Sequence, residues 1–150
     1  MILDYEREVA ILSDGGQVYQ DYYPRNFAEL DWLILVVVPG FNAGPYDAYV
    51  GYTALEAQKR KLRTVIFKKR MFKGIQHTAR HMISWARIED FDEIGAVVCR
   101  RSPLCKLYAI GFSMGYNFLQ YYLGEKGKAG KGVPMTSSVT TISTTQPGQG

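Results

Sequence analysis

Ser113 is flanked by two glycines in the stretch AIGFSMGY, residues 109–116. An apolar run precedes the serine and an amphipathic run follows it, so the pattern predicts a sharp turn between a strand and a helix. Such a turn would lift the serine hydroxyl above the edge of a sheet, where it can act as a nucleophile once a base removes its proton. The plainer alternative is a loop that contains Gly-x-Ser-x-Gly by chance. The flanking elements favour a nucleophile elbow.

Attack on a carbonyl also needs hydrogen-bond donors for the negative oxygen that forms. The Met114 amide would lie at the N-terminus of the following helix, where N–H groups are free and the helix dipole favours negative charge. A second donor should come from another loop at the same sheet edge. We expect it to be the Phe41 amide, in the loop after the apolar run 33–38. One such donor typically contributes roughly 3–4 kcal/mol of transition-state stabilisation.

The elements that would position these groups alternate between strands and helices. The run 33–38 is continuously apolar, which predicts a strand covered on both faces. The turn signal Asp14-Gly15-Gly16 predicts a hairpin. The remaining expected elements are helices over 46–61, 90–98 and 114–123, with Gly124 as the stop of the last helix, strands over 64–67 and 106–110, and a last strand or loose tail within 133–145.

This order predicts an α/β fold with a mostly parallel sheet, an N-terminal antiparallel hairpin and crossover helices. Sheets of this class bind their ligands at the carboxyl ends of the strands. The loop 39–45 and the turn 111–115 both follow predicted strands, so both are expected at that edge. This placement supports the interpretation of Ser113 as a nucleophile.

The composition is that of a globular domain, because 47% of the 150 residues are hydrophobic and 21% are charged. No apolar run approaches the roughly 20 residues of a membrane helix, and the N-terminus lacks the pattern of a signal peptide. Cys99 and Cys105 are too few for a disulfide framework or a metal site. We expect them to be small buried side chains in a reducing compartment, which suits a cytoplasmic or membrane-associated protein.

Basic residues concentrate between positions 59 and 73, within a chain whose net charge is +4. Such a cluster can attract phosphate or anionic lipid headgroups, which leaves peripheral membrane contact open. The segment has few interleaved aromatic residues and no nucleic-acid motif, so no nucleic acid is expected as a partner. We interpret the cluster as the solvated ends of a helix and a strand.

Four segments together resemble the α/β-hydrolase-domain family of lipid and ester hydrolases, in particular its medium-chain ester hydrolase and phospholipase-like branch. They are YERE at 5–8 with DGG at 14–16, VVVPGF at 36–41 with Gly44, AIGFSMG at 109–115 with Asn117, and YLGEKG at 122–127. The resemblance implies an acyl ester or lipid substrate, a partial α/β-hydrolase fold and no cofactor or metal. It also implies Ser113 as the nucleophile, with the Phe41 and Met114 amides as the oxyanion hole.

The resemblance covers only the N-terminal part of such a domain. We expect residues 1–145 to form this part, truncated near the sixth strand, and residues 146–150 to be a tail. In this fold the acid and the histidine of the triad follow the serine, whereas after Ser113 the sequence holds Glu125 as its only acid and no histidine. His77 and His81 precede the serine, and we interpret them as polar surface residues rather than a metal pair or a catalytic base.

Two segments depart from the family pattern. Arg70 is followed by Met71 where the family usually has an Arg-Gly pair, and Ala86 and Arg87 replace a glycine and an acid ahead of Asp90. Two functions therefore stay open. One is a carboxylic ester hydrolase that uses a serine nucleophile, and the other is a non-catalytic, truncated or degenerate hydrolase fold that binds or scaffolds a partner.

Overall fold

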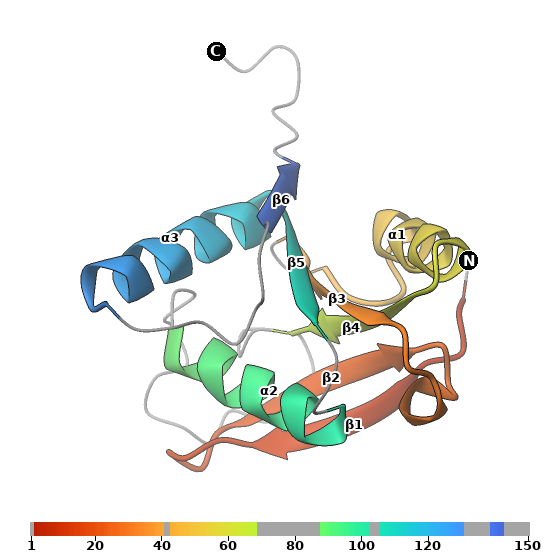
Figure 1. Cartoon of the computed structure of the whole chain (residues 1–150), viewed down its shortest axis with the longest axis horizontal. Helices are drawn as coiled ribbons and strands as arrows, with labels where there is room; N and C mark the ends of the chain where they lie inside the picture. Colours follow the sequence, from red (N-terminus) through yellow and green to blue (C-terminus); the bar gives the residue numbers. More distant parts are fainter. Residues whose placement is uncertain (1, 41–42, 69–87, 103–105, 131–138, 143–150) are drawn as a thin grey trace.

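The computed structural model describes residues 2–40, 43–68, 88–102, 106–130 and 139–142. Within these ranges, six strands form one sheet in the order β1-β2-β4-β3-β5-β6 (Figure 1). In chain order the elements are β1 (Glu6–Ile11), β2 (Gln17–Tyr23), the short 3-10 helix η1 (Phe27–Glu29), β3 (Leu33–Val38), α1 (Ala48–Lys59), β4 (Leu62–Phe67), α2 (Ile88–Arg101), β5 (Leu107–Phe112), α3 (Met114–Lys128) and β6 (Val139–Ile142).

The strand directions confirm the predicted mixture of a parallel sheet and an N-terminal hairpin. β3 pairs in parallel with β4 and with β5, and β5 pairs in parallel with β6. β2 is antiparallel to both β1 and β4. The hairpin turn forms where Asp14, Gly15 and Gly16 predict it. Gly15 adopts a φ of 84°, and the Asp14 carboxylate accepts a hydrogen bond from the Gly16 amide at 3.0 Å.

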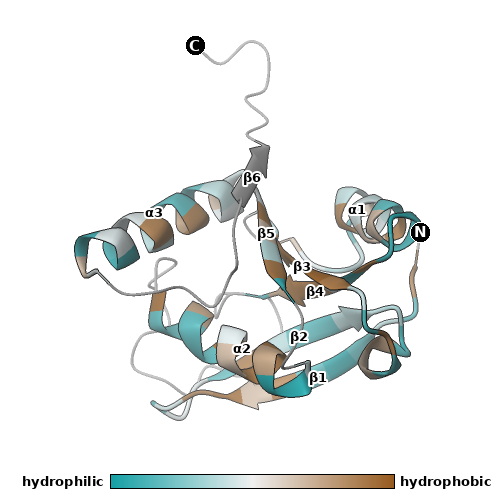
Figure 2. Ribbon diagram, in the orientation of Figure 1, coloured by the Kyte–Doolittle hydropathy of each residue, from teal (hydrophilic) through white to brown (hydrophobic). Residues whose placement is uncertain are grey.

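Helices cover both faces of the sheet, with α2 and α3 on one face and α1 on the other (Figure 1). Neighbouring residues of a strand point to opposite faces, so Val36 joins the core under α2 and α3, whereas Val37 packs with Val50 of α1. Figure 2 shows the hydrophobic colour concentrated in β3 and β4. This two-sided burial explains the continuous apolar run of β3.

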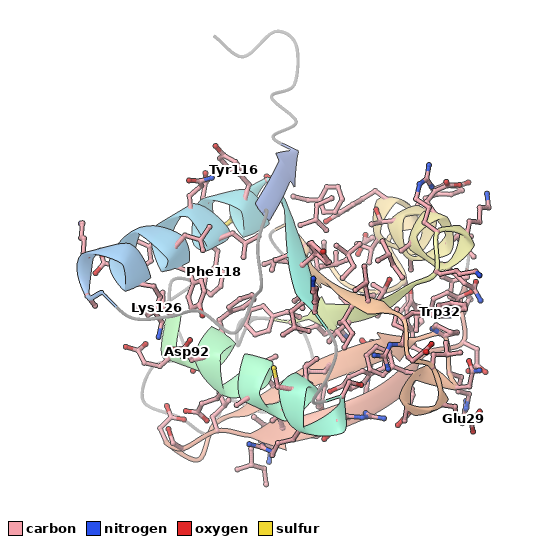
Figure 3. The ribbon with its side chains drawn as sticks, viewed as in Figure 1. Glu29, Trp32, Asp92, Tyr116, Phe118 and Lys126 are labelled. Atoms are coloured by element: carbon pink, nitrogen blue, oxygen red, sulfur yellow. The ribbon has the colours of Figure 1, made fainter. Side chains whose placement is uncertain are left out.

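α2 and α3 lie on the same face of the sheet and contact each other through aromatic packing and polar groups. Phe91 of α2 packs edge-to-face against Tyr122 of α3, with 4.8 Å between the ring centroids. The Tyr122 hydroxyl and the Lys126 ammonium both donate to the carboxylate of Asp92, so this ion pair fastens α3 to α2 (Figure 3). Among the described residues, no helix has the length and the apolar run that a bilayer crossing needs.

The prediction that the last helix ends at Gly124 is wrong. α3 continues through this glycine to Lys128. Gly130, just after the cap residue Ala129, has a φ of 63°, the left-handed conformation that glycine adopts at helix C-termini. The helix therefore stops where the backbone needs a glycine rather than at the first glycine in the sequence.

Lys68 corrects the interpretation of the basic segment. Its side chain is 0% exposed, and its Nζ lies 3.0 Å from Oδ2 of Asp21, which is also buried. The same carboxylate accepts a hydrogen bond from Arg7 at 2.8 Å. Burial lowers the pKa of Lys68, and the Asp21 carboxylate opposes this shift. Arg63 is fully buried as well, and its guanidinium donates to the carbonyl oxygens of Trp32 and Phe27. Two cations of the predicted solvated cluster are therefore buried, and positions 69–73 lie outside the described residues.

Candidate active site

Ser113 is the single residue between a strand and a helix, because β5 ends at Phe112 and α3 begins at Met114. Its φ of 53° and ψ of −116° lie in a region that residues other than glycine rarely adopt, which costs about 1–3 kcal/mol. The side chain is exposed and makes no capping hydrogen bond to α3. The predicted sharp turn is present, and it presents the hydroxyl to solvent.

The two glycines of the motif are there because main chains meet at this turn. A Cβ on Gly111 would lie 2.6 Å from the carbonyl oxygen of Gly115. A Cβ on Gly115 would lie 2.0 Å from the carbonyl oxygen of Val38 and 2.8 Å from that of Pro39. Neither position has room for a side chain, so α3 begins directly against the ends of β5 and β3.

The Met114 amide is available as a hydrogen-bond donor. Met114 is the first residue of α3, and the first amides of a helix have no acceptor within it. The Ser113 carbonyl accepts the amides of Tyr116 and Asn117 at 3.0 and 3.3 Å, and no acceptor for the Met114 amide lies among the described residues. The amide is therefore open to an incoming acceptor, and its role as an oxyanion donor stays a prediction.

The second expected donor, Phe41, lies outside the described residues, but the loop that precedes it reaches the serine. A Cβ on Gly40 would lie 3.5 Å from Cβ of Ser113 and 3.6 Å from the carbonyl oxygen of Phe112. The register explains this approach, since Val38 at the end of β3 is paired with Gly111 of β5. The loop after β3 and the turn after β5 are predicted to meet at this sheet edge. They are adjacent as far as Gly40, the last described residue before Phe41.

The position of this turn in the sheet also favours ligand binding. β3 lies between β4 and β5, and the chain passes from β3 to β4 through α1 on one face and from β4 toward β5 with α2 on the other. The strand order therefore reverses at β3 and β5, and their carboxyl ends flank a topological switch point. Open α/β sheets bind their ligands at such points.

Tyr49 of α1 also reaches this edge, although it is not among the site residues that the sequence pattern predicts. Its hydroxyl oxygen accepts a hydrogen bond from the Gly40 amide at 2.9 Å. Its ring packs edge-to-face on Phe112, with 5.0 Å between centroids. Burial raises the pKa of Tyr49, although the Gly40 hydrogen bond acts in the opposite direction. Helical spacing indicates only that some α1 tyrosine faces the sheet, so the sequence gives no signal for this contact.

Other aromatic residues near the turn contact the protein to different extents. Tyr46 packs against Tyr5 at 6.2 Å between centroids, yet it stays mostly exposed. On α3, Tyr116 points away from the side on which Phe118 packs into the core (Figure 3). The aromatic rings nearest the turn are therefore those of Phe112 and Tyr49, which pack on each other.

No described residue forms a hydrogen bond with the Ser113 hydroxyl. Glu125 lies on α3 twelve positions beyond Ser113, which places it about 18 Å away along the helix axis. It bonds to Lys128 at 3.4 Å instead. His77, His81 and Cys105 lie outside the described residues, and Cys99 is a half-buried free thiol. No cluster of three metal-ligating side chains occurs within the described part of the chain.

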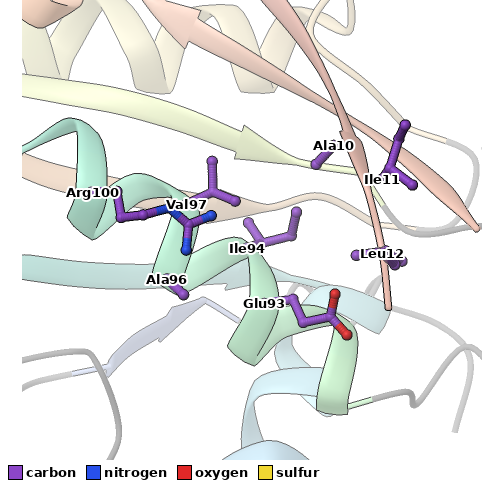
Figure 4. A pocket seen from close by; sticks show the side chains of 8 residues that line it. All are labelled: Ala10, Ile11, Leu12, Glu93, Ile94, Ala96, Val97 and Arg100. Atoms are coloured by element: carbon purple, nitrogen blue, oxygen red, sulfur yellow. The ribbon is translucent and has the colours of Figure 1, made fainter. Parts of the chain in front are cut away.

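A separate pocket lies between the end of β1 and α2, where apolar side chains from both elements face each other (Figure 4). At its rim the Glu93 carboxylate accepts hydrogen bonds from the amide and the hydroxyl of Ser13, at 2.9 and 2.6 Å. β1 is four strands away from β5 in the sheet, which corresponds to about 19 Å. This pocket is not part of the site at Ser113.

Comparison with known proteins finds curated relatives over most of this chain. No family model matches the chain. The chain is 30% identical over 133 residues to the embryogenesis-associated protein EMB8 of Picea glauca, covering 83% of this chain and 29% of that protein. It is 30% identical over 118 residues to an abhydrolase domain-containing protein of Dictyostelium discoideum, covering 77% of this chain and 30% of that protein. The chain thus spans about a third of the length of these relatives.

Solved structures resemble the fold. Esterase Est22 aligns with a TM-score of 0.67 at 11% identity, over 88% of this chain and 41% of its own. Brefeldin A esterase, a bacterial homologue of human hormone sensitive lipase, aligns with a TM-score of 0.62 at 14% identity, over 85% and 36%. The sheet order, the strand-to-helix turn and these similarities all indicate the same fold. The chain belongs to the α/β-hydrolase family and forms part of an α/β-hydrolase domain.

Proposed function

We propose that the protein is a carboxylic ester hydrolase in which Ser113 is the nucleophile. The observation that carries this proposal is the backbone of Ser113, held at a φ of 53° between two glycines that have no room for a side chain. Strained conformations persist only where the surroundings fix them, and they cluster at active sites. The strained backbone of Ser113 holds its hydroxyl exposed at a topological switch point, where a bound ester could be attacked.

The proposed reaction begins when Oγ of Ser113 attacks the acyl carbonyl carbon and its proton passes to a general base. The new C–O bond forms as the carbonyl electron pair moves to oxygen, and this oxyanion accepts hydrogen bonds from the Met114 and Phe41 amides. The bond to the alcohol oxygen then breaks, and the alkoxide takes the proton from the base. Water hydrolyses the acyl-serine by the same steps and restores Ser113.

Solved neighbours and the surroundings of the serine support the substrate class that we propose. Solved neighbours include proteins named as esterases, from a Pyrococcus furiosus esterase to Est22. The aromatic ring of Phe112 beside Ser113 suits the acyl chain of a lipid-like ester. We therefore propose acyl esters, lipid esters among them, as substrates, in the manner of a lipase or esterase of lipid metabolism.

The general base of this fold is a histidine that follows the serine, and no histidine follows Ser113 in this sequence. The test therefore supplies the base. The 150-residue chain is incubated with an alkyl fluorophosphonate at neutral pH, with and without imidazole, and mass spectrometry locates the phosphonylated residues. We expect labelling at Ser113 that increases with imidazole and disappears in Ser113→Ala.

Ser13 is an internal control, because it is an exposed serine outside the candidate site. Its labelling should stay negligible with and without imidazole. If Ser113 reacts no faster than Ser13 under any of these conditions, the hydrolase proposal fails. That result would favour the alternative of a hydrolase fold that binds or scaffolds a partner.

A further inference from the structure

We propose that the Tyr49 hydroxyl is a further hydrogen-bond donor of the site and binds the acyl oxygen of the ester that Ser113 attacks. This inference rests on the proposed function and adds a side-chain donor to the two main-chain donors. It is carried by the position of the hydroxyl, by the partner that it already has, and by the packing that holds its ring.

The Tyr49 hydroxyl lies close to the side chain of Ser113. The point where a Cβ of Gly40 would stand lies 3.5 Å from Oη of Tyr49 and 3.5 Å from Cβ of Ser113. The Tyr49 oxygen and the Cβ of Ser113 are therefore at most about 7 Å apart, the sum of these two distances. The oxyanion forms two covalent bonds beyond Oγ of Ser113. An acyl oxygen on the Tyr49 side of the serine is within reach of the phenol.

The Tyr49 hydroxyl also has a proton that it can donate to a ligand. A phenol accepts and donates hydrogen bonds, and the Tyr49 oxygen already accepts the Gly40 amide at 2.9 Å. No acceptor for its own O–H lies among the described residues, so this proton is available to a ligand. Accepting one hydrogen bond polarises the hydroxyl and makes it a stronger donor. Burial raises the pKa of Tyr49, which keeps the proton in place over the neutral range.

The Tyr49 side chain is held in place by its neighbours, and a donor stabilises a transition state most when it does not have to move. The ring of Tyr49 is held edge-to-face on Phe112, the residue directly before Ser113. The start of α1 is held as well, since the Asp47 carboxylate accepts the Gly44 amide at 2.7 Å. Tyr49 is thus fixed between the loop after β3 and the turn after β5.

Tyr52 provides a matched control. It carries the same side chain on the same helix one turn later and is 60% exposed, and its hydroxyl has no hydrogen-bond partner among the described residues. Tyr49→Phe and Tyr52→Phe remove the same atom, but only the first removes a group beside the serine. Tyr49 is itself partly exposed, so water can bind the Gly40 amide in Tyr49→Phe and the variant should fold.

The experiment measures the rate of phosphonylation at Ser113 in the presence of imidazole, for the unmodified chain and both variants. Two probes are used, an alkyl fluorophosphonate and its thiophosphoryl analogue, whose sulfur is a weak hydrogen-bond acceptor. With the phosphoryl probe, Tyr49→Phe should react about a hundredfold more slowly, the low end for the loss of one oxyanion donor. Tyr52→Phe should react at the rate of the unmodified chain.

The comparison between probes separates donation from structural support. If Tyr49 donates to the ligand oxygen, its removal slows the phosphoryl probe much more than the thiophosphoryl probe. If Tyr49→Phe slows both probes equally, or neither, the donor role is refuted while Ser113 keeps its proposed function. If Ser113 of the unmodified chain does not react at all, the proposed function fails and the role of Tyr49 fails with it.

Discussion

Replacing Gly115 by alanine tests the geometry of the turn directly. Gly115 lies in α3 with an ordinary helical backbone, so alanine would be favourable there by helix propensity alone. The added Cβ, however, would stand 2.0 Å from the carbonyl oxygen of Val38. Gly124 lies in the same helix with nothing within 4 Å of its Cβ position, so Gly124→Ala is a matched control.

The two substitutions should change stability in opposite directions. Ordinary van der Waals contact begins at 3.4 Å, so in Gly115→Ala the start of α3 must move away from β3 by more than 1 Å. The Cβ meets a main-chain carbonyl that cannot rotate away, so the cost should be about 3 kcal/mol, the upper end of the usual range for over-packing. Gly124→Ala should instead raise the free energy of unfolding by roughly 0.5–1 kcal/mol.

Urea unfolding followed by circular dichroism measures both changes, and the rate of Ser113 labelling gives a second readout. Gly115→Ala should also lose labelling, because moving α3 displaces the Met114 amide from the serine. If Gly115→Ala were as stable as the unmodified chain and Gly124→Ala no more stable than it, α3 would not abut β3. The close approach on which the elbow depends would then be absent.

Three further predictions concern buried polar groups. Arg63→Met should lower the free energy of unfolding by about 3 kcal/mol, because three oxygens that accept hydrogen bonds from its guanidinium lose their donor. Urea unfolding measures this change, and a loss below about 1 kcal/mol would contradict the prediction. Asp21→Asn should cost about 3–5 kcal/mol at neutral pH, since Lys68 would lose its buried counter-charge, and the same assay measures it. Burial, and then the hydrogen bond to Asp92, raise the pKa of Tyr122. Stability should therefore hold up to about pH 10 and fall above it, as unfolded tyrosine ionises, and Tyr122→Phe should reduce that fall in unfolding measured across this range.

Local patterns allowed much of this fold to be predicted. β3 follows from a continuous apolar run, the hairpin from Asp14-Gly15-Gly16, and the strand-to-helix turn from Gly111 and Gly115. In each case the residues that determine the structure are neighbours in the chain. Neighbouring residues likewise predicted that Ser113 and the Met114 amide lie at the turn between β5 and α3.

Features that depend on distant partners could not be predicted in this way. Lys68 has the sequence context of a solvated basic segment, and its burial depends on Asp21, which pairing of β2 with β4 brings beside it. Tyr49 meets Gly40 only because α1 packs back over the sheet. Gly124 resembles a helix stop, yet solvent surrounds it and nothing in the fold requires the helix to end there.

The backbone of residue 113 has a consequence for how this protein evolves. Main-chain contacts at Gly111 and Gly115 hold the turn, and the hydroxyl takes no part in building it. A glycine at position 113 would adopt the same φ of 53° without penalty, so selection for stability alone disfavours serine there. Loss of the hydroxyl would leave the architecture intact and relieve the strain, so a serine at this position fits the role in chemistry that we propose for it.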